Sequence, residues 1–124
     1  MDYKKDLKQV KLLKLKNVKL ILGGKNRQLS TFNALKYLNN NKDISKVLIH
    51  DAARPNLSIK LFNSIIKNMK NCRAVIPKIN IQDAVKQKID SSLNEYILGK
   101  KRENLFLTQT PQAFNLKEIY QLHK

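Results

Sequence analysis

Cysteine, tryptophan, glycine and proline are scarce or absent in this 124-residue sequence, which has one cysteine, no tryptophan, three glycines and three prolines. The single Cys72 excludes an intrachain disulfide and is typical of a reducing, cytoplasmic location. So few glycines and prolines exclude a low-complexity linker. No apolar run approaches the roughly 20 residues that cross a bilayer, so we expect no membrane partner. The two histidines, His50 and His123, belong to no Cys/His cluster with zinc spacing.

Acidic residues are also few, with 9 Asp and Glu against 25 Lys and Arg, which gives a formal net charge of +16. Such a charge is a first sign of nucleic-acid binding. However, only four of the basic residues are arginines, aromatic residues make up 6% of the chain, and the lysines are spread along its whole length. Lys, Asn and Ile enrichment of this kind is what an AT-rich genome produces. We therefore expect no specific nucleic-acid partner, although the charge favours anionic small molecules through long-range steering.

Hydrophobic periodicity predicts an α/β chain, and the length suits one domain with one core. Apolar residues at helical spacing predict helices in four segments, 4–16, 27–38, 58–69 and 116–122. Short apolar runs predict strands in three segments, 18–22, 46–50 and 73–76. Because strands and helices alternate, we expect a Rossmann-like parallel sheet with flanking helices.

The pattern changes at Ile79, where mixed alternation replaces helical spacing. Ser91 and Ser92 predict a turn, and Tyr96 begins a returning apolar run. We therefore expect a long β-excursion, an extended arm, over about 79–104 rather than another βα unit.

Residues 47–55, VLIHDAARP, form the most informative segment of the chain. Residues 47–49 are a continuous apolar run, as expected of a strand that is covered on both faces. Ligands of open α/β sheets bind outside the carboxyl ends of the strands, so Asp51 would lie where a metal or a phosphate is bound. The alternative is that Asp51 caps a turn and pairs with Arg54.

Four segments, in one order over most of the chain, resemble the motifs of the 2-C-methyl-D-erythritol 4-phosphate cytidylyltransferases of the non-mevalonate route to isoprenoids. They read GGKNRQLS at 23–30, VLIHDAARP at 47–55, AVIP and QDAVK at 74–77 and 82–86, and RENLFLTQTPQAF at 102–114. The resemblance implies transfer of a cytidylyl group from CTP to 2-C-methyl-D-erythritol 4-phosphate, with CDP-methylerythritol and pyrophosphate as products. It also implies a single partial nucleotidyltransferase domain over 1–124, with an arm at about 79–104 that joins a homodimer.

The resemblance also assigns roles to individual residues. It places catalysis on Asp51 and Arg102, nucleotide binding on Gly23, Gly24, Ser30, Asp51 and Ala52, and substrate binding on Asp83, Arg102 and Thr110. A carboxylate suits Mg²⁺, which prefers oxygen ligands, so Asp51 is also the expected metal ligand. The guanidinium of Arg102 can hold a phosphate by two parallel hydrogen bonds. Two alternatives stay open: Gly23 and Gly24 form an ordinary tight turn, or Arg102 lies in a solvated basic turn.

The chain departs from the family pattern in three places. Ala84 stands where the family has a threonine that contacts the polyol phosphate, so that hydroxyl is lost. The family's N-terminal Gly-rich loop and its C-terminal N-x-K-x-T segment find no match, so we expect a central fragment that is inactive alone. Alternative functions are a cytidylyltransferase for another polyol phosphate such as ribitol 5-phosphate, a catalytically inactive dimerising fragment, and a basic nucleic-acid-binding protein.

Overall fold

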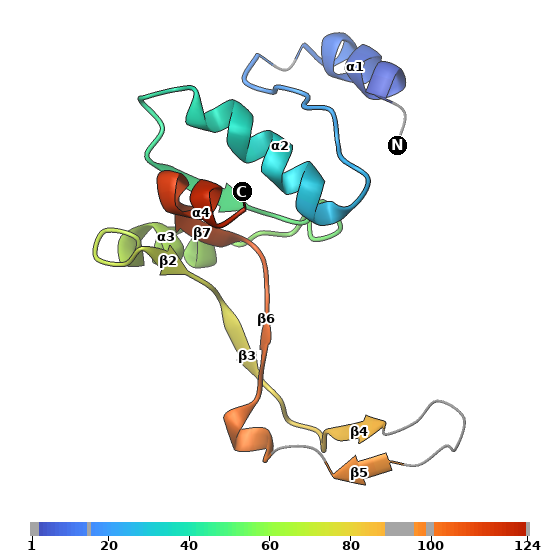
Figure 1. Ribbon diagram of the computed structural model, residues 1–124, viewed down its shortest axis with the longest axis vertical. Helices are drawn as coiled ribbons and strands as arrows, with labels where there is room; N and C mark the ends of the chain where they lie inside the picture. The colour runs from blue at the N-terminus through green and yellow to red at the C-terminus, as the bar shows by residue number, and fades with distance from the viewer. Residues whose placement is uncertain (1–2, 15, 89–95, 99–100, 124) are drawn as a thin grey trace. The chain divides into compact units, whose positions relative to one another are not determined.

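The computed structural model describes residues 3–14, 16–88, 96–98 and 101–123 (Figure 1). It divides the chain into two compact units. One comprises Met1–Val47 with Asn115–Lys124, and the other comprises Leu48–Phe114. No helix within the described ranges is long and apolar enough to cross a membrane.

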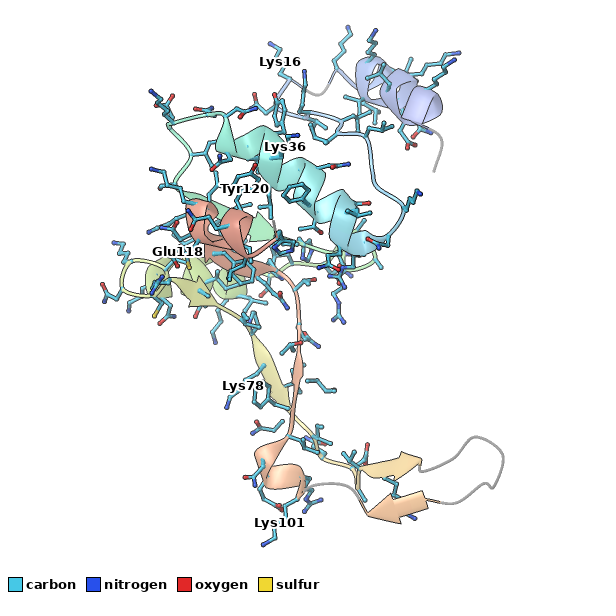
Figure 2. The ribbon with its side chains drawn as sticks, viewed as in Figure 1. Lys16, Lys36, Lys78, Lys101, Glu118 and Tyr120 are labelled. Atoms are coloured by element: carbon cyan, nitrogen blue, oxygen red, sulfur yellow. The ribbon has the colours of Figure 1, made fainter. Side chains whose placement is uncertain are left out.

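Helices dominate the first unit, which contains α1 (Tyr3–Leu12), α2 (Arg27–Asn39) and α4 (Leu116–Leu122). Helices α2 and α4 lie against each other. Their buried side chains are Leu35 and Leu116, each 1% exposed. Beside them lies the ring of Tyr120, which is labelled on α4 in Figure 2. It stacks on the ring of Phe32, with centroids 5.7 Å apart and an interplanar angle of 5°. The contact between α2 and α4 therefore joins segments that are far apart in the sequence.

The predicted strand at 18–22 is wrong, because these residues have no regular secondary structure. A strand needs a neighbour that pairs its backbone N–H and C=O groups. Here the carbonyl of Leu22 instead accepts a hydrogen bond of 3.0 Å from the side-chain amide of Asn33. The first helix is also shorter than predicted. It ends at Leu12, and Lys14 has a φ of 50°, a left-handed conformation that an α-helix does not continue.

The second unit is built on β1 (Lys46–Ile49), which straddles both units, α3 (Ile59–Asn68), β2 (Ala74–Val75) and β7 (Gln112–Asn115). These strands form one sheet in the order β1-β7-β2. The predicted strands at 46–50 and 73–76 are confirmed as β1 and β2. The sequence analysis did not predict β7, which lies between them and pairs antiparallel with β2, so the sheet is not parallel throughout as expected. Its four residues are too few to show a period of two.

The core of this unit forms where α3 meets the sheet. It consists of three buried side chains and three partly buried neighbours, namely Ile65, Met69 and Ala113 with Leu48, Leu61 and Val75. Ser58 begins α3, and its hydroxyl accepts a hydrogen bond of 3.2 Å from the N–H of Leu61. This cap fits the preference of helix N-termini for serine.

The predicted arm is confirmed as two antiparallel ladders (Figure 1). In the first, β3 (Lys78–Asn80) pairs with β6 (Phe106–Thr108). In the second, β4 (Lys86–Lys88) pairs with β5 (Tyr96–Leu98). A short 3₁₀ helix, η1 (Arg102–Asn104), leads into β6. The predicted turn at Ser91 and Ser92 lies outside the described residues.

Candidate active site

Asp51 and Thr110 meet at the carboxyl end of β1. The strand ends at Ile49, and the backbone N–H of Asp51 donates to the hydroxyl oxygen of Thr110 at 3.2 Å. Thr110 is buried, with 8% of its surface exposed, and Asp51 is half-buried. This contact joins two predicted site residues that are 59 positions apart. The prediction that Asp51 follows the end of a sheet strand is confirmed.

The turn after Asp51 is closed by two further hydrogen bonds. The N–H of Arg54 donates to the carbonyl of Asp51 at 3.0 Å. The ring Nε2 of His50 lies 2.8 Å from the carbonyl oxygen of Arg54, which fits an Nε2–H donor. Ala52 is exposed within this turn. A cavity of about 290 Å³ lies here, and His50, Arg54 and Thr110 are among the residues that line it. The turn thus presents backbone and side-chain groups to a space that admits a small ligand.

The Gly23–Gly24 loop is a second group of predicted site residues, and it belongs to the other compact unit. The N–H of Gly24 donates to the hydroxyl oxygen of Ser30 at 2.9 Å, and that hydroxyl donates to the carbonyl of Asn26 at 2.9 Å. Asn26 also caps α2, because its side-chain oxygen accepts from the N–H of Leu29 at 2.8 Å. Ser30 therefore fixes the loop at the start of α2.

A cavity of about 320 Å³ is lined by Asp6, by residues 20–24 and by Ser30. The structure thus brings all three predicted residues of this segment to one hollow. Their contact with a nucleotide stays a prediction.

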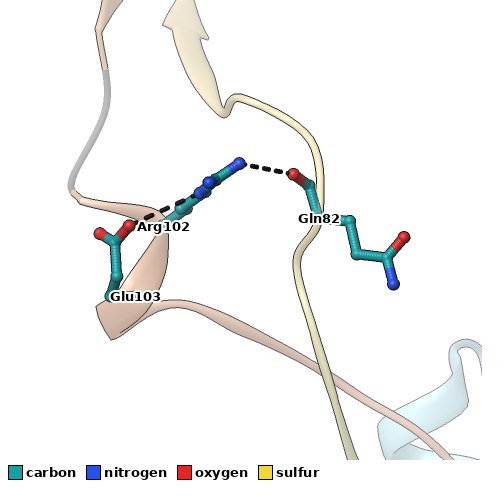
Figure 3. A network of polar contacts seen from close by, with 3 residues as sticks. All are labelled: Gln82, Arg102 and Glu103. Atoms are coloured by element: carbon teal, nitrogen blue, oxygen red, sulfur yellow. Dashed lines mark hydrogen bonds and ion pairs between the residues drawn. The ribbon is translucent and has the colours of Figure 1, made fainter.

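Arg102 and Asp83 lie on the arm. The guanidinium Nη1 of Arg102 donates to the backbone carbonyl of Gln82 at 2.8 Å, so Arg102 contacts the residue that precedes Asp83 (Figure 3). Its Nε lies 3.5 Å from the carboxylate of Glu103. A cavity of about 610 Å³ is lined by residues 80–82 with Arg102 and Glu103. Asp83 is exposed.

Sequence reasoning missed the contacts of Gln82, Glu103 and the His50 ring. A backbone carbonyl carries no sequence signal, so the role of Gln82 could not have been read from the chain. Glu103 is adjacent to Arg102 in the sequence, and that adjacency was the available signal. The position of His50 beside Asp51 was visible, but its bond to Arg54 depends on how the turn closes.

Asp51 is the one carboxylate at the carboxyl end of β1 that the sequence analysis predicts as a ligand for Mg²⁺. Among the described residues no group of three or more His, Cys, Asp or Glu side chains could hold a metal ion. Mg²⁺ is commonly held by one or two carboxylates together with substrate phosphates and water. Asp51, just after the carboxyl end of β1, fits such a site as one protein ligand. Phosphate oxygens would supply further ligands.

Known proteins match this chain over almost its whole length. The family model described as IspD, 2-C-methyl-D-erythritol 4-phosphate cytidylyltransferase, matches residues 1–124. The chain is 46% identical over 119 residues to the bifunctional enzyme IspD/IspF of Pelagibacter ubique, covering 96% of this chain and 31% of that protein. It is 40% identical over 123 residues to the 2-C-methyl-D-erythritol 4-phosphate cytidylyltransferase of Dictyoglomus thermophilum, covering 98% and 51%.

A solved structure gives the same result for the fold. The 4-diphosphocytidyl-2C-methyl-D-erythritol synthase of Anaerococcus prevotii matches with a TM-score of 0.77 and 34% identity, covering 96% of this chain and 51% of that one. The chain thus spans between about a third and a half of the length of these relatives. The predicted α/β nucleotidyltransferase fold is confirmed. The chain belongs to the 2-C-methyl-D-erythritol 4-phosphate cytidylyltransferase family.

Proposed function

We propose that this chain carries part of the active site that transfers a cytidylyl group from CTP to 2-C-methyl-D-erythritol 4-phosphate, in isoprenoid precursor synthesis. The products are CDP-methylerythritol and pyrophosphate. One observation carries the proposal. The hydroxyl oxygen of Thr110 accepts a hydrogen bond from the backbone N–H of Asp51. This contact joins two segments of the family pattern at the carboxyl end of β1, a place that we call the Asp51–Thr110 corner. The family match over the whole chain supports the same reaction.

The main barrier to this reaction is electrostatic. An oxygen of the polyol phosphate attacks the α-phosphorus of CTP, and the bond from that phosphorus to the pyrophosphate oxygen breaks. Both reactants are anions, so the site must neutralise their charge and hold them in line. The guanidinium of Arg102 supplies a positive charge with a fixed fork of donors that suits a phosphate. The +16 formal charge of the chain favours the encounter with both anions.

The other site residues bind the substrate or the nucleotide in this proposal. Thr110 bonds the substrate beside Asp51, and Asp83 accepts hydrogen bonds from the hydroxyl groups of the polyol. Gly23, Gly24 and Ser30 face the nucleotide at the start of α2, where backbone amides attract negative charge. Ala84 offers no hydroxyl, so the polyol phosphate depends more on Arg102.

Asp51 is the residue that would hold Mg²⁺. When bound, the ion would neutralise phosphate charge at the carboxyl end of β1. Its half-buried carboxylate follows the strand directly, which supports this placement.

The arm supports a homodimer in this proposal. In the β3–β6 ladder Ile79 pairs with Leu107, so these two side chains share one face of the ladder. They are 46% and 56% exposed, which is unusual for two adjacent large apolar side chains. A second copy of the chain would cover them. The single cysteine of the sequence is in keeping with a cytoplasmic protein.

The test is a substrate assay on a chimera in which this chain replaces the matching segment of the Dictyoglomus thermophilum relative. We expect pyrophosphate release that requires both CTP and 2-C-methyl-D-erythritol 4-phosphate, with CDP-methylerythritol detected by mass spectrometry. Faster turnover of ribitol 5-phosphate would favour the other polyol phosphate. No turnover of either substrate by a folded chimera would favour the inactive dimerising subunit.

A further inference from the structure

The guanidinium of Arg102 is held by two different acceptors. Its Nη1 donates to the carbonyl of Gln82, which ties it to the opposite side of the arm, and its Nε faces the carboxylate of Glu103 (Figure 3). The first contact is a backbone hydrogen bond of 2.8 Å and the second an ion pair of 3.5 Å. The first contact holds one nitrogen of the guanidinium, and the second places a negative charge beside the group.

Arg102 keeps further binding capacity in this arrangement. A guanidinium has five N–H donors. The contacts that the described residues make with Arg102 involve Nε and one N–H of Nη1. Both N–H groups of Nη2 and the second of Nη1 are not used by those contacts. The cavity of about 610 Å³ lies beside this group.

Glu103 lines the same cavity, so its charge acts on any anion that enters. The side chains of Arg102 and Glu103 are 55% and 69% exposed, and an ion pair so open to water is weak. A stronger anion can therefore displace the carboxylate. A phosphate monoester carries close to two negative charges above its second pKa of about 6, whereas a carboxylate carries one.

We propose that Glu103 occupies Arg102 in the free chain and competes with the phosphate of the ligand for it, so that Glu103 sets the concentration at which the phosphate binds. Every anion has to displace the same carboxylate, so the competition lowers the affinity for all of them. A phosphate dianion gains more from the charge of Arg102 than a monoanion does, and it displaces Glu103 at a lower concentration. The inference rests on the proposed function, in which Arg102 binds the phosphate of the polyol.

The first test is direct binding to the chain itself, with Glu103→Gln compared with the unchanged sequence. The sequence has only four arginines, so the Nε–Hε signal of Arg102 can be followed by ¹⁵N NMR. Inorganic phosphate should move this signal in both proteins, and at lower concentration in Glu103→Gln. Acetate, a monoanion, should move it only at higher concentrations than phosphate does, and again at lower concentration in Glu103→Gln than in the unchanged sequence. Equal responses of the two proteins to both anions would overturn the proposal.

The second test is kinetic and uses the chimera described above. Removing one negative charge beside the phosphate should lower KM for the polyol phosphate by roughly two- to fivefold, a modest effect because solvent screens the charge. The KM for CTP and kcat should change less. Asp43→Asn makes the same charge change at an exposed site in the other compact unit and should leave KM for the polyol phosphate as it was.

The outcomes separate this inference from the proposed function. A chimera that turns over CTP and the polyol phosphate, but whose KM is unchanged or higher in Glu103→Gln, contradicts the role of Glu103 alone. A folded chimera with no turnover contradicts the proposed function, and the NMR titration then decides the role of Glu103. A higher KM would mean that Glu103 positions Arg102 instead of competing for it.

Discussion

Thr110 has a structural role and a proposed chemical role at the same position. Its hydroxyl oxygen accepts the N–H of Asp51, and its own hydrogen atom can serve another acceptor. Because Thr110 is buried, the loss of that oxygen would leave the Asp51 amide without this acceptor.

We expect Thr110→Val to weaken the corner at the end of β1. Valine keeps the shape but offers no acceptor, and an unpaired amide that is part-buried costs about 1–3 kcal/mol. The Asp51 amide should then exchange with solvent faster than in the unchanged chain, whereas Thr110→Ser should preserve its protection. Hydrogen-exchange NMR measures both. Equal Asp51 exchange in the two variants would show that the hydroxyl does not hold the turn.

Gly24 is required for a close approach and not for an unusual backbone angle, since neither Gly23 nor Gly24 has a positive φ. A Cβ on Gly24 would lie 2.9 Å from the backbone carbonyl carbon of Leu29, which cannot move without disturbing α2. A Cβ on Gly23 would lie 3.2 Å from the hydroxyl of Ser30, an atom that can shift.

Gly24→Ala should therefore disturb the loop more than Gly23→Ala. We expect Gly24→Ala to lower the free energy of unfolding by about 1–3 kcal/mol, as overpacking typically does. Gly23→Ala should cost less than about 1 kcal/mol, because a side chain can relieve the contact. Urea denaturation followed by circular dichroism compares the two. A larger loss in Gly23→Ala would contradict the geometry of this loop.

At the scale of elements, helices were the easier part to predict from the sequence. The stripe in 27–38 and the serine before α3 gave two helices close to their observed bounds. Strands were harder, because a strand is defined by its partner. The apolar run at 18–22 has strand composition but no strand, and β7 was missed although it lies between β1 and β2. The arm was visible because its pattern differs from the helical stripes around it.

The residues of the candidate site were also easier to predict than their contacts. Asp51 after a strand was predictable from the apolar run that precedes it. Its contact with Thr110 depends on tertiary structure, and so do the bonds of Arg102 to Gln82 and Glu103. Composition and spacing report which residues are present, but not which backbone carbonyl a side chain will meet.

The arm is the element whose surface best tests the proposed homodimer. Leu107 and Thr108 are neighbours in β6, so their side chains point to opposite faces of the ladder. Leu107→Asp places a charge on the apolar face with Ile79 and should shift the chimera from dimer to monomer. Thr108→Asp adds the same charge on the other face and should leave the dimer intact. Sedimentation equilibrium measures both, and an intact Leu107→Asp dimer would exclude this face as the contact.

At the scale of the whole molecule, the candidate site residues fall into three groups. The Gly23–Gly24 loop lies in one unit. The other unit contains the Asp51–Thr110 corner and the cavity that Arg102 lines with Glu103 and residues 80–82. The chain spans 51% of the length of the Dictyoglomus thermophilum relative. The proposed chemistry requires cations around the triphosphate, and the sequence analysis expects some of these in the two segments of the family pattern that find no match in this chain.

We therefore expect the chain alone to show negligible turnover of CTP with 2-C-methyl-D-erythritol 4-phosphate. Each lost preorganised contact of this kind typically costs on the order of 10²–10³ in rate. Pyrophosphate release by the purified chain, measured beside the chimera at equal concentration, tests this expectation. Equal rates in the two proteins would show that these 124 residues suffice.

The most direct test of the central claim is the rate of CDP-methylerythritol formation by the chimera with Asp51→Asn, measured over a range of Mg²⁺ concentrations. Asparagine keeps the size of the side chain and the backbone N–H that Thr110 accepts, so the corner should stay folded. If Asp51 holds the ion, the rate should fall on the order of 10²-fold or more, with little recovery as Mg²⁺ rises. An unchanged rate and an unchanged Mg²⁺ dependence would contradict the assignment of Asp51 and, with it, the proposed active site.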